Sequence, residues 1–370
     1  MYETYQLYWW FIVSLLAGIF VFMMFVQGGQ TLIFCLSENE LHKDMIVNSI
    51  GKKWELTFTT LVMFGGACFA AFPLFYATSF GGAYWIWMAI LFCFIIQAVA
   101  YEYRKKPHNF LGQKTYEIFL LINGSVGVFL IGLMLSTFFS GNEFKLNETN
   151  FVLWQNSLRG LEIFKNPFNY ILGITLVFSS RVGGNLYLMN NIDDEYLNAK
   201  FRKSLKVNFI IFLLFFILFL LWIFTKDGFM MGEDGIVVMK KYQYILNFIN
   251  TPILLVTFVL GLILVSYGIY KALFAKSNKG IFFYGLGIVM AVTSLFFSLG
   301  LSGNLFYPSY THLQSSLSIY NSSSSLYTLR VMSVISVFIP FVLAYIIYVW
   351  RAMDKVKLTS KEIQNDEHIY

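Results

Sequence analysis

The sequence repeats one feature along its whole length: apolar runs that are long enough to cross a lipid bilayer. About 20 apolar residues form a helix that spans the hydrocarbon core of a membrane. Backbone groups in lipid must be hydrogen-bonded within the protein, and no segment alternates between apolar and polar residues as a barrel strand does. We therefore predict an all-α, polytopic integral membrane protein. Nine transmembrane helices are expected, near residues 8–36, 56–80, 83–101, 116–139, 168–190, 207–225, 249–274, 280–304 and 327–350.

Composition supports this class and excludes others. Of the 370 residues, 58% are hydrophobic and only 12% are charged, whereas soluble domains carry about 25% charged residues. The net charge of +6 does not indicate a nucleic-acid partner, because the basic residues lie between apolar runs. We expect a multi-pass protein surrounded by lipids in the cytoplasmic (inner) membrane of a bacterium or an archaeon. The first apolar run is too long for a signal peptide, so we expect it to remain as a helix.

The distribution of lysine and arginine predicts the orientation. In membrane proteins these residues are in excess in the connections on the cytoplasmic side. Here they concentrate in alternate connections, for example residues 104–106 and 200–206, and in the tail after the last apolar run. We therefore predict that the N-terminus lies outside and the C-terminus inside, which requires an odd number of crossings.

Polar residues interrupt or end three of the apolar runs at one membrane depth, near the predicted inner face. A carboxyl group in a partly dry site can exchange a proton, and amide side chains can hold the waters that conduct it. We therefore predict a proton-uptake route, which in this sequence involves Gln27, Gln30, Glu55, Gln97 and Glu102.

The alternative is that the two acids lie among lipid head groups and form ion pairs. Glu55 and Glu102 would then pair with Lys52, Lys53 or Arg104. The sequence favours ion pairing for Glu102. For Glu55, which follows a tryptophan and precedes an apolar run, both interpretations stay open.

Arg181 lies near the middle of the fifth apolar run. A charge at that depth is costly unless it is paired or lines a water-filled cavity. No carboxylate in the sequence is clearly at its depth, so we expect a contact with a partner chain, a lipid or a cofactor head group, or else a side chain that snorkels to the surface. The adjacent Gly183-Gly184 pair would allow another helix to approach closely.

The sequence indicates no metal site and no catalytic residue. The histidines are confined to connections and the tail, so none could hold a membrane haem from within an apolar run: His42, His108, His312 and His368. The cysteines match no zinc or redox spacing: Cys35, Cys68 and Cys93. Any redox cofactor would therefore belong to another chain.

Several short motifs occur in order along the chain. Trp54-Glu55 opens the second run, Gly65-Gly66 precedes Phe-Ala-Ala-Phe-Pro at residues 69–73, and Tyr-Glu-Tyr-Arg closes the third run at residues 101–104. Asn166-Pro167 opens the fifth run. In this order the motifs resemble those of subunit II of the cytochrome bd-type quinol oxidases, the subunit without haem. The resemblance covers essentially the whole chain.

The resemblance implies a fold, a partner and a reaction. The expected fold has two helical bundles plus one peripheral helix. The expected complex is a heterodimer with a subunit I that carries haems b and d, oxidises quinol and reduces oxygen to water in the respiratory chain. The resemblance leaves open a small third subunit and a structural quinone or lipid. Trp54, Arg104 and Arg181 are the candidates for contacts with a partner, cofactor or lipid.

The chain departs from the family where the proton route is expected. Gln27 and Gln30 stand where the family usually has aspartate, and Gln97 stands where arginine is common. Glutamine can hold water but cannot titrate, which leaves Glu55 as the main protonatable group. Two other classes therefore stay open. One is a purely structural assembly subunit, and the other is a secondary transporter, which should show broken helices at the membrane midplane and symmetric halves.

Overall fold

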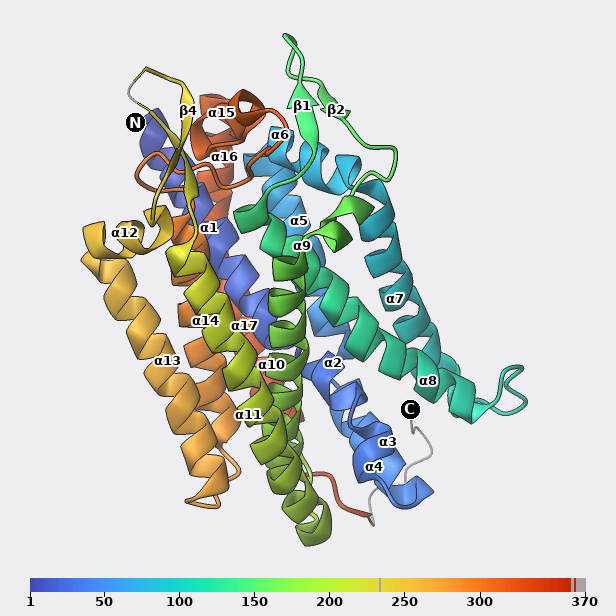
Figure 1. The fold of residues 1–370 in the computed structure, drawn as a ribbon. Coiled ribbons are helices and arrows are strands. Elements are labelled where there is room, and N and C mark those ends of the chain that lie inside the picture. The colour runs from blue at the N-terminus through green and yellow to red at the C-terminus, as the bar shows by residue number, and fades with distance from the viewer. Residues whose placement is uncertain (233, 361–362, 364–370) are drawn as a thin grey trace.

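The computed structural model describes residues 1–232, 234–360 and 363, and it consists almost entirely of helices (Figure 1). His368, one of the histidines considered above, lies outside these residues. Within them, nine helical segments are long and apolar enough to cross a membrane, which confirms the predicted all-α class. The spans are Tyr2–Gln30, Glu40–Ala71, Tyr84–Tyr103, Gln113–Ser140, Pro167–Asn191, Glu195–Thr225, Pro252–Leu273, Gly280–Ser298 and Leu326–Met353.

Shorter helices and two hairpins divide and connect these spans. The elements up to the fourth span are α1 (Tyr2–Met23), α2 (Phe25–Gln30), α3 (Ile33–Leu36), α4 (Glu40–Gly51), α5 (Trp54–Ala71), α6 (Pro73–Tyr76), the π-helix η1 (Ala77–Gly82), α7 (Tyr84–Tyr103), α8 (Gln113–Ile122), the π-helix η2 (Asn123–Gly127) and α9 (Val128–Ser140). The next are strands β1 (Phe144–Leu146) and β2 (Val152–Trp154), the 3-10 helix η3 (Leu161–Lys165), α10 (Pro167–Asn191), α11 (Glu195–Thr225), strands β3 (Gly228–Met231) and β4 (Val237–Lys240), and α12 (Gln243–Asn250). The last are α13 (Pro252–Leu273), α14 (Gly280–Ser298), η4 (Leu313–Ser315), α15 (Ile319–Ser322), α16 (Leu326–Ile335), η5 (Ser336–Phe338) and α17 (Ile339–Met353).

Several helices extend beyond the apolar runs that predicted them, because polar residues cap them outside the hydrophobic stretch. The Asn39 side chain accepts a hydrogen bond from the His42 N–H at 2.8 Å and starts α4. Asp194 accepts the Leu197 N–H at 2.8 Å and starts α11. Such caps satisfy N–H groups that a helix start leaves free. Hydropathy alone detects only the apolar middle of these helices.

The first four spans and the next four form two bundles that pack side by side, with the ninth span at the periphery (Figure 1). Helix α17 has no buried residue along its length. The segment that precedes it in the ninth span is nevertheless attached to α1. The Tyr8 and Ser336 hydroxyl groups are 2.6 Å apart, and the Trp9 indole N–H donates to Ser333 at 3.0 Å.

Glycines bring the two bundles into close contact. A Cβ atom on Gly28 would lie 1.8 Å from the carbonyl oxygen of Ser180, and one on Gly184 would lie 2.5 Å from the Gly29 nitrogen. Only glycine therefore allows α2 and α10 to cross at this distance, as small residues do between membrane helices. The Gly-Gly pair beside Arg181 has the packing role that the sequence suggested.

The connections gather at two ends of the bundle (Figure 1). One end carries the N-terminus, both β-hairpins and the segment 300–325, and we call it the hairpin end. The other carries α4 and the connection between α7 and α8, and we call it the opposite end. The sequence predicts that the hairpin end faces outside, and this orientation stays a prediction.

Candidate functional site

Three glutamines that the sequence singled out lie fully buried between α2 and α7. The Gln27 side-chain NH₂ is 3.5 Å from the Gln97 carbonyl oxygen, and the Gln30 NH₂ donates to the Tyr101 hydroxyl at 3.1 Å. The Trp54 indole stacks on the Tyr101 ring, with centroids 5.5 Å apart. We call Gln27, Gln30, Gln97 and Tyr101 the amide cluster. It is neutral and polar, in the middle of apolar helices.

The amide cluster has more hydrogen-bonding groups than protein partners. The side-chain oxygens of Gln27 and Gln30 and the NH₂ of Gln97 are buried without a partner, and so is the side-chain oxygen of Asn123 in η2. Buried polar groups of this kind are normally satisfied by ordered water. The chemistry of the cluster therefore suits bound water, which amide groups can orient but cannot protonate.

The two predicted carboxylates lie apart from this cluster. Glu55 and Glu102 are both exposed on the surface of the chain, and neither forms an ion pair within the described residues. The predicted alternative partners are engaged elsewhere: Arg104 pairs with Asp44 and Glu117. Glu55 nevertheless borders the cluster in sequence, because its neighbour Trp54 covers Tyr101.

A charge cluster at the opposite end is centred on Arg104, which is fully buried. Its guanidinium donates to Asp44 at 2.8 Å and to Glu117 at 2.8 and 3.2 Å. Lys105 is 2.9 Å from the second oxygen of Asp44, and Lys43 is 3.3 Å from the second oxygen of Glu117. The cluster joins α4, α7 and α8. Buried charges of opposite sign need such mutual neutralisation.

Sequence reasoning missed Asp44 and Glu117. Glu117 carried a usable signal, since it is an acid just inside the predicted fourth helix, where an unpaired charge is costly. Asp44 carried no such signal, because it lies in a charged connection between apolar runs, where acidic residues are normally exposed to solvent. The sequence placed Arg104 among contacts to a partner or lipid, whereas the contacts seen here are internal.

A second buried ion pair was also missed. The Lys53 ammonium, 1% exposed, is 3.1 Å from the Asp354 carboxylate. The same carboxylate oxygen accepts from Tyr187 at 3.3 Å and from Asn191 at 3.2 Å. This pair fixes the end of the peripheral helix α17 to the first bundle and to α10.

Arg181 is half-buried, and its Nε–H donates to the Asn208 side-chain oxygen at 2.7 Å. This partner is an amide of the same chain, within the predicted sixth helix. The expected contact with another chain, a lipid or a cofactor stays a prediction for the remaining guanidinium N–H groups.

Comparison with known proteins identifies the family of this chain. The sequence profile described as cytochrome bd terminal oxidase subunit II matches residues 5–353. The chain belongs to this family. It is 27% identical to the probable cytochrome oxidase subunit 2 of Haemophilus influenzae and to the cytochrome bd-I ubiquinol oxidase subunit 2 of Escherichia coli K12, over 99% of this chain and 98% of each relative. The cytochrome bd ubiquinol oxidase subunit 2 of Bacillus subtilis is 24% identical over 95% of this chain and 97% of that relative.

The subunit II fold is also found among solved structures. The bd oxidase of Geobacillus thermodenitrificans contains a chain that superposes with a TM-score of 0.67 at 12% identity, over 95% of this chain and 98% of that chain. The family resemblance deduced from the short motifs is therefore confirmed. Within the described residues, no group of three or more His, Cys, Asp or Glu side chains has the arrangement of metal ligands.

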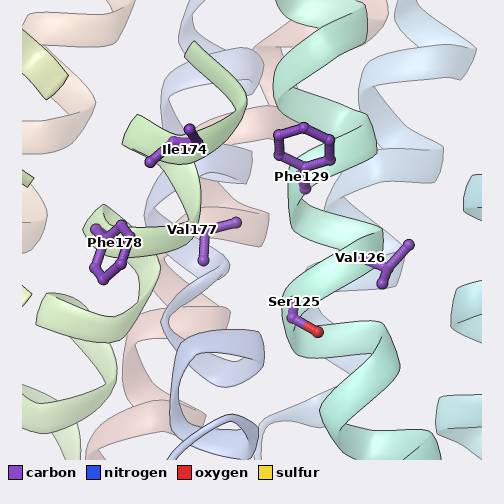
Figure 2. Close-up of a pocket in the computed structure, with 6 residues that line it drawn as sticks. All are labelled: Ser125, Val126, Phe129, Ile174, Val177 and Phe178. Carbon is purple, nitrogen blue, oxygen red and sulfur yellow. The ribbon is translucent and has the colours of Figure 1, made fainter. Parts of the chain in front are cut away.

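This subunit II chain also has an apolar groove between its two bundles (Figure 2). The groove has a volume of about 300 Å³ and is open along one side. Side chains from η2, α9 and α10 line it: Ser125, Val126, Phe129, Ile174, Val177 and Phe178. Arg181 lies one helical turn beyond the lining residue Val177 on α10, where i and i+4 positions share a helix face.

Proposed function

We propose that this chain is the haem-free half of a membrane complex that oxidises quinol and reduces oxygen to water. Membership of the subunit II family supports this function, and the Escherichia coli relative is named as a subunit of a ubiquinol oxidase. The haems and the site of quinol oxidation would belong to a subunit I partner. The complex would lie in the bacterial inner membrane, with the hairpin end outside.

We further propose that Glu55 exchanges protons for this reaction at the edge of the amide cluster. The observation that supports the proposal is the stack of Trp54 on Tyr101: the residue before the exposed Glu55 packs on a member of the amide cluster, whose amide groups have unsatisfied hydrogen-bonding atoms. The amides cannot titrate. Glu55 would therefore supply the proton, and the amide cluster would hold water behind it.

The test is Glu55→Gln in the purified complex with its partner subunit. We expect turnover to fall by about tenfold or more, as loss of a proton-transferring group typically causes, with the haem content unchanged. Glu195→Gln is the control, because Glu195 is also exposed but lies in the first turn of α11, whereas the amide cluster lies on α2 and α7; it should retain wild-type turnover. Unchanged turnover in Glu55→Gln would remove Glu55 from the route.

A purely structural role is the second candidate function. It is favoured by the fully paired Arg104 cluster and by the lack of any carboxylate or histidine among the members of the amide cluster. Gln27→Leu separates the two functions. A water-holding role predicts lower turnover in an intact complex, whereas an assembly role predicts less complex with normal turnover per haem.

We also propose that the groove in Figure 2 holds an amphiphile with an apolar chain and a hydrogen-bond-accepting head group. The lining residues suit the chain. Arg181 suits the head group because, among the described residues, its Nε–H is the guanidinium group with a hydrogen-bond partner. A quinone and a phospholipid share this chemistry. Mass spectrometry of molecules extracted from the complex should identify one of the two, and its amount should drop in Val177→Trp, which fills the groove. Native mass spectrometry of the intact complex would reveal any small third subunit.

A further inference from the structure

Glu162 is a deeply buried acid at the hairpin end that no part of the proposed reaction uses. It lies in η3, between β2 and α10, and is 3% exposed. One carboxyl oxygen accepts the Gly160 N–H at 2.8 Å. The other has no hydrogen-bond partner. Among the described ion pairs none includes Glu162, and the nearby Lys165 pairs with Glu143 instead.

Other unpaired polar groups lie around it. Within the described residues, the fully buried Tyr307 hydroxyl and both polar atoms of the Asn142 side chain form no hydrogen bond of normal geometry. The Tyr307 hydroxyl lies near the polar side chains of Ser79, Thr137 and Asn142, and Glu162 is close enough that its charge would act on that hydroxyl. We call Asn142, Glu162 and Tyr307 the Glu162 site.

The backbone holds these side chains in place firmly. Asn142 exchanges backbone hydrogen bonds with Pro308 and Tyr310, at 3.0 and 3.2 Å. Gly160 packs so closely on Ala83 that a Cβ atom there would come within 2.9 Å. The side chains therefore cannot simply turn to solvent. Each unpaired group costs about as much as a lost hydrogen bond, so several together would cancel much of the net stability of a fold.

We propose that the Glu162 site binds internal water and that Glu162 carries an exchangeable proton there. Ordered water satisfies buried polar groups that lack protein partners, and a neutral carboxylic acid can donate as well as accept. The surroundings of the site favour the protonated, neutral form of Glu162. Burial raises the pKa of Glu162 and the nearby Glu143 raises it further, whereas backbone hydrogen bonds from Glu162 itself and from Gly160, together with Lys165, offset only part of this increase.

The site also has a short connection to the surface. The exposed Tyr310 donates its hydroxyl to Glu143 at 2.7 Å, and Tyr310 follows the buried Tyr307 in the same segment. Glu162 acts electrostatically on both tyrosines. A proton held on Glu162 could therefore exchange with the surface at the hairpin end through water beside Tyr307 and Asn142. This site is separate from the Glu55 proposal, which concerns the other end of the bundle.

Infrared spectroscopy of the purified complex tests the proposal directly. At pH 7 the wild-type complex should show a carbonyl band of a protonated carboxylic acid that is lost in Glu162→Gln and retained in the control Glu148→Gln, which changes an exposed acid in the turn between β1 and β2. Transfer to D₂O should shift the band, because water reaches the acid. Asn142→Leu, which removes two water-binding atoms, should slow that shift.

Two results would overturn the proposal. A carboxylic-acid band that is identical in wild type and Glu162→Gln would show that Glu162 is ionised. A band that belongs to Glu162 but never shifts in D₂O would show that the site is dry. If Glu162→Gln fails to assemble, Glu162→Asp keeps the acid, and its band must be displaced from the wild-type position; an unmoved band rejects the assignment. None of these readouts depends on turnover.

Discussion

Arg104 and Glu162 are both buried, ionisable residues at opposite ends of the bundle, and the chain accommodates them in different ways. Arg104 lies between Asp44 and Glu117, with contacts of 2.8 Å to both. The Glu162 carboxyl group accepts a hydrogen bond from the Gly160 N–H and forms no ion pair among the described residues. A paired charge is fixed in its protonation state and joins helices, whereas an unpaired acid takes up a proton. The first site is therefore suited to holding the fold, and the second to exchanging protons.

The largest expected effect comes from breaking the paired site. Arg104→Leu leaves Asp44 and Glu117 buried without their shared partner, and removal of one member of a buried pair costs about 3–5 kcal/mol. We expect little assembled complex in membranes and a much lower thermal midpoint. Lys106→Leu, an exposed neighbour on the same connection, is the control and should behave like wild type. An Arg104→Leu complex of normal yield and midpoint would contradict the structural role.

A smaller effect is expected at the Lys53–Asp354 pair, which holds only the end of one peripheral helix. Lys53→Met should destabilise the complex by about 3 kcal/mol, because Asp354 stays buried and charged. The double variant Lys53→Met with Asp354→Leu should recover much of this loss, since both charges are then removed. The measurement is a double-mutant cycle of thermal midpoints. Additive losses would show that the two side chains do not act as a pair.

The fold could be predicted largely from the sequence, because lipid restricts the possible structures so strongly. Apolar runs of sufficient length gave the nine spans, and short motifs gave the family. Helix ends were less predictable. Caps such as Asn39 and Asp194 extend helices into polar sequence, where hydropathy carries no signal.

The sites were harder to predict because they depend on which face of each helix a side chain occupies. The depth of Gln27 and Gln97 in the membrane is readable from sequence, and the structure does bring them together. Glu55 has the same predicted depth but faces outward. The long-range partners of Arg104 and Lys53 arise from helix packing. Glu162 lies in a connection between predicted helices, where an acid is normally exposed and attracts no notice.

The Glu162 site predicts that the stability of the complex depends on pH. The pKa of Glu162 is raised in the folded chain by burial, so the folded state binds more protons than the unfolded state above the usual glutamate range. Stability should therefore fall as pH rises from about 4.5 through the folded pKa. Glu162→Gln removes the titrating carboxyl group, and with it the loss of stability at higher pH. The difference in thermal midpoint between Glu162→Gln and wild type should increase from pH 5 to pH 8, with Glu148→Gln, at an exposed position, as the control. A difference that is independent of pH would contradict a buried, titrating acid.

The amide cluster provides the smallest expected effect, because it contains neither a paired nor an unpaired charge. Tyr101→Phe removes the hydroxyl that accepts from Gln30 but keeps the ring that stacks on Trp54. If water already solvates the amides, it can replace the lost acceptor, and the cost should be at most about 1 kcal/mol. The exposed Tyr103 offers a matched Tyr103→Phe control, and both variants are compared by thermal midpoint in the purified complex. A loss as large as that of Lys53→Met would show that the cluster is dry and that its few direct hydrogen bonds are essential. In that case water could not pass behind Glu55, and the neutral region would resemble the rigid Arg104 cluster rather than the exchangeable Glu162 site.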